Sequence, residues 1–232
     1  MKAHVILKVR GDFACFSRPE FKVERVSYPV MTPSAARGLL EAIFWKPEFR
    51  WEIREIWVLN PIKEVTIMRN ELAERQGGHP VFIENQRQQR VSLVLQNVAY
   101  VIGADLKLMP HATDHLAKYL SQFERRLGRG QCYHTPYLGT REFPAWFEEV
   151  AGDETPDEID REIGVMLFDL AYIEDHGRQE LSFHRHGSQD TRPRKAKGYS
   201  EPLFFSARLE AGVLKVPGEK YQELYNLERR HA

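Results

Sequence analysis

Two histidines and a lysine recur at helical spacing in the middle of the chain. His111, His115, Lys118 and Gln122 follow one another at intervals of four, three and four residues, with Tyr119 beside them. In a helix, this spacing places the four side chains on one face. A histidine can act as a general base or acid, and a lysine can stabilise negative charge on a phosphate. An ordinary solvent-exposed helix face has the same polar composition, so both interpretations stay open.

A glycine-rich turn follows this segment, and arginines flank it. The turn is Leu127-Gly-Arg-Gly-Gln131. Glycine lacks a Cβ and can adopt positive φ, so the backbone of such a turn can approach a phosphate closely. The turn has neither the spacing nor the lysine of a P-loop, and it suits the end of a helix equally well. The flanking arginines favour anion contact, and they are Arg125, Arg126, Arg129 and Arg141.

Charges are segregated along the chain although they cancel in total. The chain has 33 basic and 33 acidic residues, which argues against binding nucleic acid through bulk charge. Between Glu148 and Glu162 the only base is Arg161, so we expect this acidic stretch to face solvent. Residues 185–197 form a basic segment, which a solvated loop of mixed charge would explain equally well. Its cations are Arg185, Arg192, Arg194, Lys195 and Lys197.

Several aromatic side chains lie close to these segments and could stack on bases, although most aromatics of this size belong to the core. The two cysteines, Cys15 and Cys132, lack the clustered spacing of zinc ligands, so we expect reduced core thiols. No nucleophile-elbow, zinc-protease or dinucleotide fingerprint is present, so those enzyme classes have no motif in support. The aromatic candidates are Tyr28, Phe44, Trp45, Tyr133 and Tyr137.

Hydrophobic periodicity predicts a mixed α+β chain. Helices are expected from Thr32-Pro33 to a stop before Pro47, and from His111 to Leu127 with Leu116, Leu120, Phe123 and Leu127 buried. A polar excursion is expected at 70–90, and a hairpin turn at 210–212. Strands are expected at 5–10, 51–60, 63–69, 91–102, 165–173, 180–185, 203–209 and 213–216.

The order of these elements predicts an RNA-recognition-like or ferredoxin-like domain over residues 1–145. An acidic linker at 146–163 and a smaller C-terminal antiparallel β domain at 164–232 complete the expected organisation. No apolar run approaches the roughly 20 residues that cross a bilayer. Lys8 and Arg10 also interrupt the N-terminus too early for a secretory signal, so we expect cytoplasmic residence and no membrane partner.

Three segments carry a family resemblance. Residues 26–47 combine a serine-tyrosine entry, a proline-capped helix and a Trp-Lys-Pro ending. Residues 53–62 read Ile-Arg-Glu-Ile-Trp-Val-Leu-Asn-Pro-Ile, and residues 137–143 read Tyr-Leu-Gly-Thr-Arg-Glu-Phe. In order and spacing these segments resemble the Cas5 family of CRISPR-associated proteins, subtype Cas5d or Cas5c of type I-C systems. The C-terminal third resembles the family only in its strand-rich character.

This resemblance implies an endoribonuclease that cuts the repeat hairpin of precursor guide RNA (pre-crRNA). It implies cleavage without a metal or cofactor, through attack by the ribose 2′-hydroxyl on the adjacent phosphate. Members of the subtype then stay on the 5′ handle of the guide in the type I-C interference complex, which makes the Cas7 and Cas8c subunits expected partners. The positions expected to contact RNA are Tyr28, Arg37, Arg125, Arg126, Gly128, Arg129, Gly130, Arg141, Arg192, Arg194 and Lys195.

The family's catalytic set is a tyrosine in the Tyr-Trp-Lys-Pro ending and a lysine-histidine pair early in the later helix. Phe44 stands at the tyrosine position and has no hydroxyl, and the pair falls on Ala117-Lys118. We therefore assign an electrostatic role to Lys118 and the role of base to His115 or Tyr119, with Tyr28 as a further alternative. A second hypothesis is an inactive subunit that only binds the 5′ handle. A third is general binding of double-stranded DNA, which would weaken steeply with salt.

Overall fold

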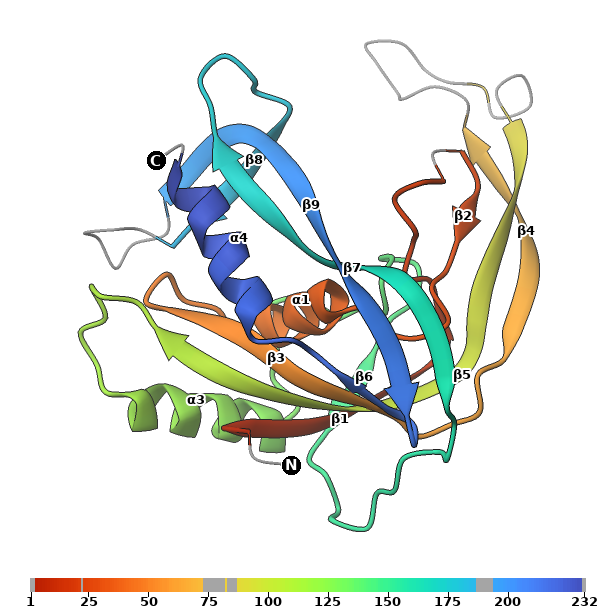
Figure 1. The fold of residues 1–232 in the computed structure, drawn as a ribbon, viewed down its shortest axis with the longest axis horizontal. Helices are drawn as coiled ribbons and strands as arrows, with labels where there is room; N and C mark the ends of the chain where they lie inside the picture. Colours follow the sequence, from red (N-terminus) through yellow and green to blue (C-terminus); the bar gives the residue numbers. More distant parts are fainter. Residues whose placement is uncertain (1–2, 22, 73–81, 83–86, 187–193, 231–232) are drawn as a thin grey trace.

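The computed structural model describes residues 3–21, 23–72, 82, 87–186 and 194–230 (Figure 1). Within these residues, ten strands form one sheet and three helices are present. The chain is therefore a mixed α+β protein, as its hydrophobic periodicity predicts. The sheet is antiparallel except at one short strand, which pairs in parallel with its neighbour.

Four strands and two helices in the first part of the chain alternate as strand, helix, strand, strand, helix, strand. Their strands lie in the spatial order β6-β1-β5-β3, and every neighbouring pair is antiparallel. The two helices connect strands that are not neighbours in the sheet. These elements are β1 (Val5–Ala14), α1 (Pro33–Ile43), β3 (Phe49–Val58), β5 (Arg87–Leu108), α3 (Leu116–Gly128) and β6 (Trp146–Glu148).

The remaining strands extend this sheet at two places. β2 (Arg25–Val26) and β4 (Glu64–Leu72) both pair with the first part of β5. On the other side, β10 (Val213–Lys215) pairs with β3 and also with β9, so the sheet continues into the last third of the chain. There β9 (Arg194–Glu210) pairs with β7 (Arg161–Glu174) and β8 (Leu181–Arg185).

The expected hairpin turn between β9 and β10 is confirmed. Ala211 and Gly212 both have positive φ, at 45° and 73°. A Cβ at Gly212 would lie 2.0 Å from the carbonyl oxygen of Asp157, so only glycine fits this turn.

Aromatic rings hold the helices on the sheet. Phe49 of β3 lies 5.1 Å from Phe44 and 5.4 Å from Tyr119 between ring centroids, so it joins the end of α1 to α3. Trp51, two residues along β3, lies 5.0 Å from Phe123 of α3. The C-terminal helix α4 (Glu219–Arg230) packs on β7.

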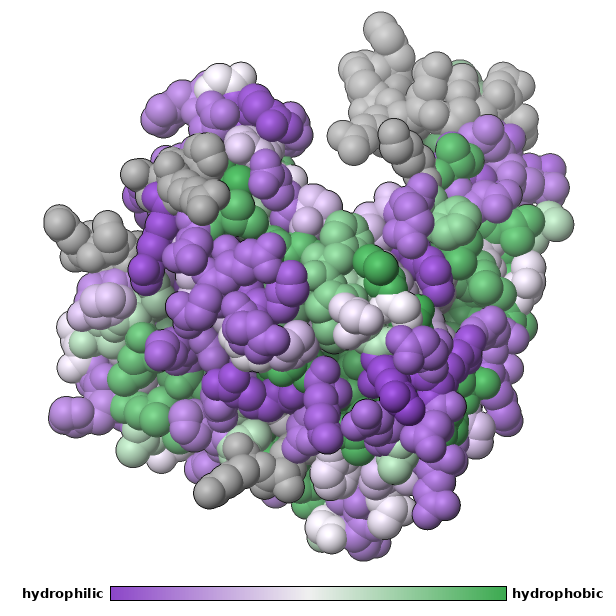
Figure 2. Space-filling view, viewed as in Figure 1, coloured by the Kyte–Doolittle hydropathy of each residue, from purple (hydrophilic) through white to green (hydrophobic). Residues whose placement is uncertain are grey.

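Two groups of strands lie at opposite ends of the molecule, with a notch between them. β8 and the adjoining ends of β7 and β9 lie at one end, and β2 with the outer parts of β4 and β5 lies at the other (Figure 1). Figure 2 shows a notch between these two ends, with hydrophobic side chains along its floor. Among the described residues, no helix combines the length and apolar character needed to cross a bilayer.

Several sequence expectations were wrong in detail. The second helix begins at Leu116, not at His111, so His111 and His115 precede it. The expected linker 146–163 is strand at both ends, in β6 and β7. Residues 194–197 of the expected basic loop belong to β9. The glycine-containing part of the 70–90 excursion lies outside the described residues.

The structure also contains elements that the sequence did not indicate. Helix α4 and strands β2 and β6 were not predicted. Cys15 is buried as expected, but Cys132 is exposed, so it is not a core thiol. The acidic stretch faces solvent as expected at most positions, although Glu154 folds back to accept hydrogen bonds from two backbone N–H groups.

Candidate functional site

The end of α1 positions the Phe-Trp-Lys-Pro segment at residues 44–47. Thr32 caps the helix as predicted, because its Oγ1 accepts a hydrogen bond from the Ala35 N–H at 3.2 Å. The helix ends at Ile43, and Phe44 is already extended, with φ −152° and ψ 115°. The following residues therefore leave the helix as irregular backbone and present successive side chains in different directions.

Phe44 points into the core. Its ring is 3% exposed and packs against Phe49. The Arg126 guanidinium lies 5.3 Å above the ring and also donates to the carbonyl oxygen of Ile43 at 2.9 Å. Arg126 therefore fastens α3 to the end of α1, and the family's tyrosine position is occupied here by a buried hydrocarbon ring.

The first turn of α3 carries the exposed lysine and histidine. Lys118 is 60% exposed, and its Nζ donates to Asp114 Oδ1 at 2.8 Å. His115 occupies the N-cap position, is exposed, and makes no side-chain capping hydrogen bond. A helix N-terminus has a partial positive charge, which favours a nearby phosphate. These two side chains are therefore available to a ligand from solvent.

Tyr119 is buried and cannot be the exposed neighbour of Lys118 that the spacing suggested. Its hydroxyl donates to Glu48 Oε1 at 2.7 Å, and the Thr113 hydroxyl donates to the same oxygen. Burial and the Glu48 carboxylate raise the pKa of Tyr119 to about 12. Burial opposes ionisation of Glu48, yet the Tyr119 and Thr113 hydrogen bonds and the Lys46 charge lower its pKa. Tyr119 is thus a neutral hydrogen-bond donor.

Lys46 links this cluster to the end of α1. Its Nζ lies 5.3 Å above the ring of Tyr119 and 3.7 Å from Glu48 Oε2. Tyr119 directly follows Lys118 in the chain. The Phe-Trp-Lys-Pro segment and the start of α3, the two places where the family resemblance puts catalytic residues, therefore lie against each other.

Two histidines from distant parts of the chain meet at the next residue, Pro47. His111 Nε2 lies 3.2 Å from the Pro47 carbonyl oxygen, and His186 Nδ1 lies 3.4 Å from it. Loss of hydration, together with the positive charges of Arg50 and Arg37, lowers the pKa of His186 to about 3. The ring of His186 is therefore neutral at physiological pH.

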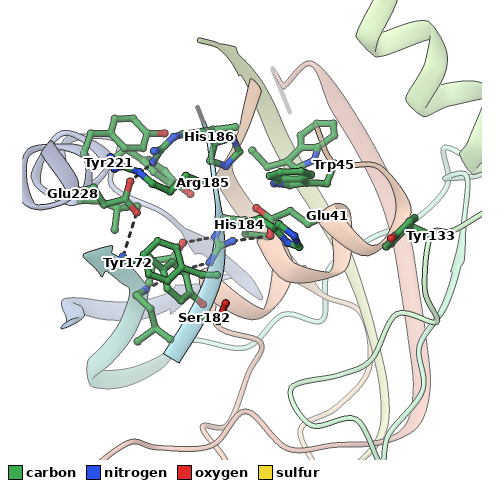
Figure 3. A pocket seen from close by; sticks show the side chains of 18 of the residues that line it. Glu41, Trp45, Tyr133, Tyr172, Ser182, His184, Arg185, His186, Tyr221 and Glu228 are labelled. Atoms are coloured by element: carbon green, nitrogen blue, oxygen red, sulfur yellow. Dashed lines mark hydrogen bonds and ion pairs between the residues drawn. The ribbon is translucent and has the colours of Figure 1, made fainter. Parts of the chain in front are cut away.

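A cavity of about 490 Å³ opens beside this point (Figure 3). Trp45 lines it, with ring centroids 5.9 Å from His184 and 5.4 Å from His186. In Figure 3, Trp45 and Tyr133 stand on one side, and Tyr221 and Glu228 stand on the other. The cavity thus lies between the end of α1, strand β8 and helix α4.

The glycine-rich turn ends α3. Gly130 has φ +60°, and its N–H donates to the Leu127 carbonyl oxygen at 3.0 Å, as in an ordinary helix end. Arg125, Arg129 and Arg141 are exposed and make no ion pair with any other described residue. Gly128 is also exposed and lies next to Glu149, whose carboxylate a Cβ there would touch at 2.9 Å.

Other residues expected at RNA are placed apart from this turn. Tyr28 is fully buried, and its hydroxyl accepts a hydrogen bond from the Leu167 N–H at 3.1 Å. Arg37 forms a paired contact with Asp169 at 2.6 and 2.7 Å and a further one with Glu41. Arg194 and Lys195 are exposed on β9, where Arg194 pairs with Glu174. Arg192 lies outside the described residues.

The sequence did not identify His184 of β8, His186 directly after this strand, or the role of Lys46. The His-x-His pattern at 184–186 could have indicated that both histidines lie on one face, because alternate residues of an extended segment share a face. That this face meets Trp45 depends on how β8 and β9 fold back over α1. Among the residues that the structure describes, no group of three histidine, cysteine, aspartate or glutamate side chains is arranged to hold a metal ion.

Comparison with known proteins identifies the family of this chain. The family model described as CRISPR-associated protein Cas5, of the Cas5d type, matches residues 4–217. Two curated proteins named CRISPR pre-crRNA endoribonuclease Cas5d are similar to this chain. The one from Thermus thermophilus is 60% identical over 230 residues, which is 99% of this chain and 98% of that protein. The one from Mannheimia succiniciproducens is 38% identical over 240 residues, covering 94% and 96%.

A solved structure described as a CRISPR-associated protein has a similar fold. It matches with a TM-score of 0.62 and 21% identity, over 93% of this chain and 92% of that one. The fold and the matches to the family model and to curated relatives lead to the same assignment. This chain belongs to the Cas5d family of CRISPR-associated proteins.

Proposed function

We propose that this protein is an endoribonuclease that cuts the repeat hairpin of pre-crRNA. The proposal is supported by 60% identity, over nearly the whole length of both chains, to a protein named as a pre-crRNA endoribonuclease. It is also supported by the contact between the Phe-Trp-Lys-Pro segment and the start of α3, where Lys46 lies over Tyr119. The start of α3 adds the exposed His115 and Lys118, residue types that suit acid–base chemistry and charge stabilisation at a phosphate.

In the proposed reaction, His115 accepts the proton of the 2′-hydroxyl. The 2′ oxygen then attacks the adjacent phosphorus while the bond from phosphorus to the 5′ oxygen breaks, and the leaving oxygen takes up a proton from water. The products are a 2′,3′-cyclic phosphate and a 5′-hydroxyl. Lys118 stabilises the charge that develops on the phosphate, with the α3 N-terminus behind it. Tyr119 contributes by holding Glu48 and thereby Lys46.

The test is incubation of the purified protein with end-labelled repeat RNA in excess chelator. A single discrete product with a 5′-hydroxyl on its downstream fragment is expected. Complete dependence on a divalent cation would refute the metal-independent reaction. Absence of any product, with tight RNA binding, would support the second candidate below.

That second candidate is a subunit that binds the 5′ handle without cutting. Two observations favour it: Phe44 is buried and has no hydroxyl, and Ala117 stands where the family has a chemically active residue. A protein of this kind would bind repeat RNA and leave it intact. General binding of double-stranded DNA would instead appear as equal competition by unrelated DNA and a steep loss of affinity with salt.

We further propose that residues 1–145 form an RNA-recognition-like or ferredoxin-like unit. The strand order β6-β1-β5-β3, with α1 and α3 as connections, supports this interpretation. A smaller C-terminal β domain would follow over residues 164–232. In a type I-C interference complex in the cytoplasm, the expected partners are the guide RNA and the Cas7 and Cas8c subunits.

A further inference from the structure

The cavity beside Trp45 has aromatic walls and a balanced set of charges. Three arginines and three carboxylates line it: Arg37, Arg50 and Arg185 against Glu41, Asp169 and Glu228. With neutral histidines its formal charge is zero. A phosphate would meet no net positive charge in such a lining, whereas an uncharged ring with donors and acceptors on its edge would find partners for both.

The polar groups of the lining are already fixed in place. Asp169 is 1% exposed and accepts two hydrogen bonds from Arg37. Arg50 donates to Glu228 at 2.5 Å and lies 4.7 Å above the ring of Tyr225. A ligand that enters the cavity would therefore meet a preformed polar rim.

The position of the cavity connects it to the proposed cleavage site. Trp45 and Lys46 are consecutive residues, yet Trp45 turns to His184 and His186 while Lys46 turns to Tyr119. The Pro47 carbonyl oxygen contacts His186 on the cavity side and His111 on the α3 side. An RNA strand with its backbone at Lys46 therefore has the cavity within reach of one base.

We propose that this cavity binds one unstacked nucleobase of the RNA, with the base lying against Trp45 (Figure 3). The volume of about 490 Å³ is ample for a nucleotide, and cavities that bind small ligands typically measure about 300–1,000 Å³. Stacking on an aromatic side chain is tolerant of base identity, and the arginines and carboxylates supply the hydrogen bonds that select among bases. The inference rests on the proposed function, since it assigns a subsite for the same RNA.

The experiment measures binding separately from cleavage. Each RNA of the series carries a single 2′-deoxy nucleotide at the cut position, which blocks cleavage by the proposed reaction. Each member also has one abasic site, at a different unpaired position of the repeat. An abasic nucleotide keeps its phosphate and sugar and loses only the base. We expect wild-type protein to bind one member about five- to a hundredfold more weakly than the intact RNA.

The Trp45→Ala variant should bind the intact RNA more weakly than wild-type protein does, by a similar factor. It should bind the one sensitive abasic RNA as tightly as it binds the intact RNA. Trp45→Phe should retain most of the affinity, and Trp146→Ala is the control, since Trp146 is 47% exposed on β6 and lines no part of the cavity. His184→Ala offers a second, exposed variant if Trp45→Ala folds poorly, and it should show the same pattern in milder form.

Equal binding of every abasic RNA by wild-type protein would overturn the assignment. So would an equal loss of affinity by Trp45→Ala on every member of the series, because the side chain would then not touch a base. Cleavage of unblocked RNA is assayed in parallel. If wild-type protein binds one abasic RNA more weakly but cuts no unblocked RNA, the proposed reaction is refuted while the base subsite is supported.

Discussion

Lys118 and His115 differ from the other candidates for chemistry in being both exposed and close to the Phe-Trp-Lys-Pro segment. Tyr119, which the sequence placed beside them, is buried and donates to Glu48. Phe44 lies in the core, where it packs on Phe49. Of the residues to which the sequence analysis gave a chemical role, these two are therefore the ones whose side chains can reach an RNA phosphate from solvent.

Replacing Lys118 with alanine should slow cleavage of a cognate repeat hairpin at least about tenfold, because one charge that stabilises the transition state is removed. The affinity for the hairpin should change little, since Lys118 supplies one of several cations. Lys215→Ala is the matched control, because Lys215 is an exposed lysine on β10 that also pairs with a carboxylate. A wild-type rate in the Lys118 variant, measured under single-turnover conditions, would remove this residue from the chemistry.

His186 should make the protein less stable in mild acid. Its folded-state pKa of about 3 lies below the ordinary value of 6.5, so the unfolded chain binds the extra proton first as the pH falls. Stability is therefore lost between pH 6.5 and about 3, by up to about 1.4 kcal/mol per pH unit from this group. Urea unfolding of His186→Gln should show a shallower loss across that window than wild type. His176→Gln is the control, because His176 is exposed. If stability fell equally steeply with pH in wild type, His186→Gln and His176→Gln, the assignment to His186 would be contradicted.

At the level of elements, the contact between α1 and β7 positions the Phe-Trp-Lys-Pro segment. Arg37 of α1 and Asp169 of β7 form this contact, and burial opposes the charge on Arg37 while Asp169 and Glu41 raise its pKa well above its ordinary value. Removing one partner of a buried ion pair destabilises the folded protein more than replacing both partners with apolar residues, because the remaining charge is left buried and unpaired.

Asp169→Ala should therefore destabilise the protein by about 3–5 kcal/mol, since it leaves the Arg37 charge without its main partner. The double variant Arg37→Met with Asp169→Leu should recover much of that loss. Glu41→Gln, which removes only the less buried partner of Arg37, is the milder comparison. Urea unfolding measures all three, and a loss below about 1 kcal/mol for Asp169→Ala would show that the pair does not hold α1 in place.

The sequence predicted α1 well because its signals are local. Thr32 and Pro33 define its start, and the apolar spacing that ends at Ile43 defines its buried face. It placed the start of α3 too early, because polar spacing from His111 onward also fits a helix. Helix α4 was missed because most of its 12 residues are polar. Its apolar pattern is limited to a few positions, among them Tyr221, Leu224 and Tyr225.

The cavity beside Trp45 could not be predicted from local pattern. Its walls come from α1, β8 and α4, and α1 lies more than a hundred residues before the other two in the chain. Their meeting depends on β10, because this strand pairs with both β3 and β9 and brings the last third of the chain over α1. Sequence resemblance in that third was limited to strand character, so it carried no residue-level information.

Across the whole molecule, acidic and basic groups cancel, and binding of RNA must depend on local arrangements. Hydrophilic and hydrophobic side chains alternate over the face in Figure 2 without a single dominant region. At the end of α3, Arg125 and Arg129 are exposed and make no ion pair with other described residues. Cations at the C-terminal end of a helix also interact favourably with the helix dipole.

Replacing Arg125 and Arg129 together with alanine should weaken binding of repeat RNA and flatten its salt dependence. For a single strand, removing one cation from a phosphate should reduce the slope of log K against log salt by about 0.7. Arg208→Ala serves as the control, since Arg208 is exposed on β9 opposite Glu162. An unchanged slope in the double variant would place the RNA elsewhere on the surface.

Cleavage of a repeat RNA with a single 2′-deoxy nucleotide at the cut position tests the proposed chemistry most directly. If the 2′-hydroxyl is the nucleophile, wild-type protein should bind this RNA as tightly as the unmodified one and leave it uncut, in chelator or with magnesium. Cleavage of the deoxy RNA at the same position would contradict the account, because another nucleophile would then attack the phosphate.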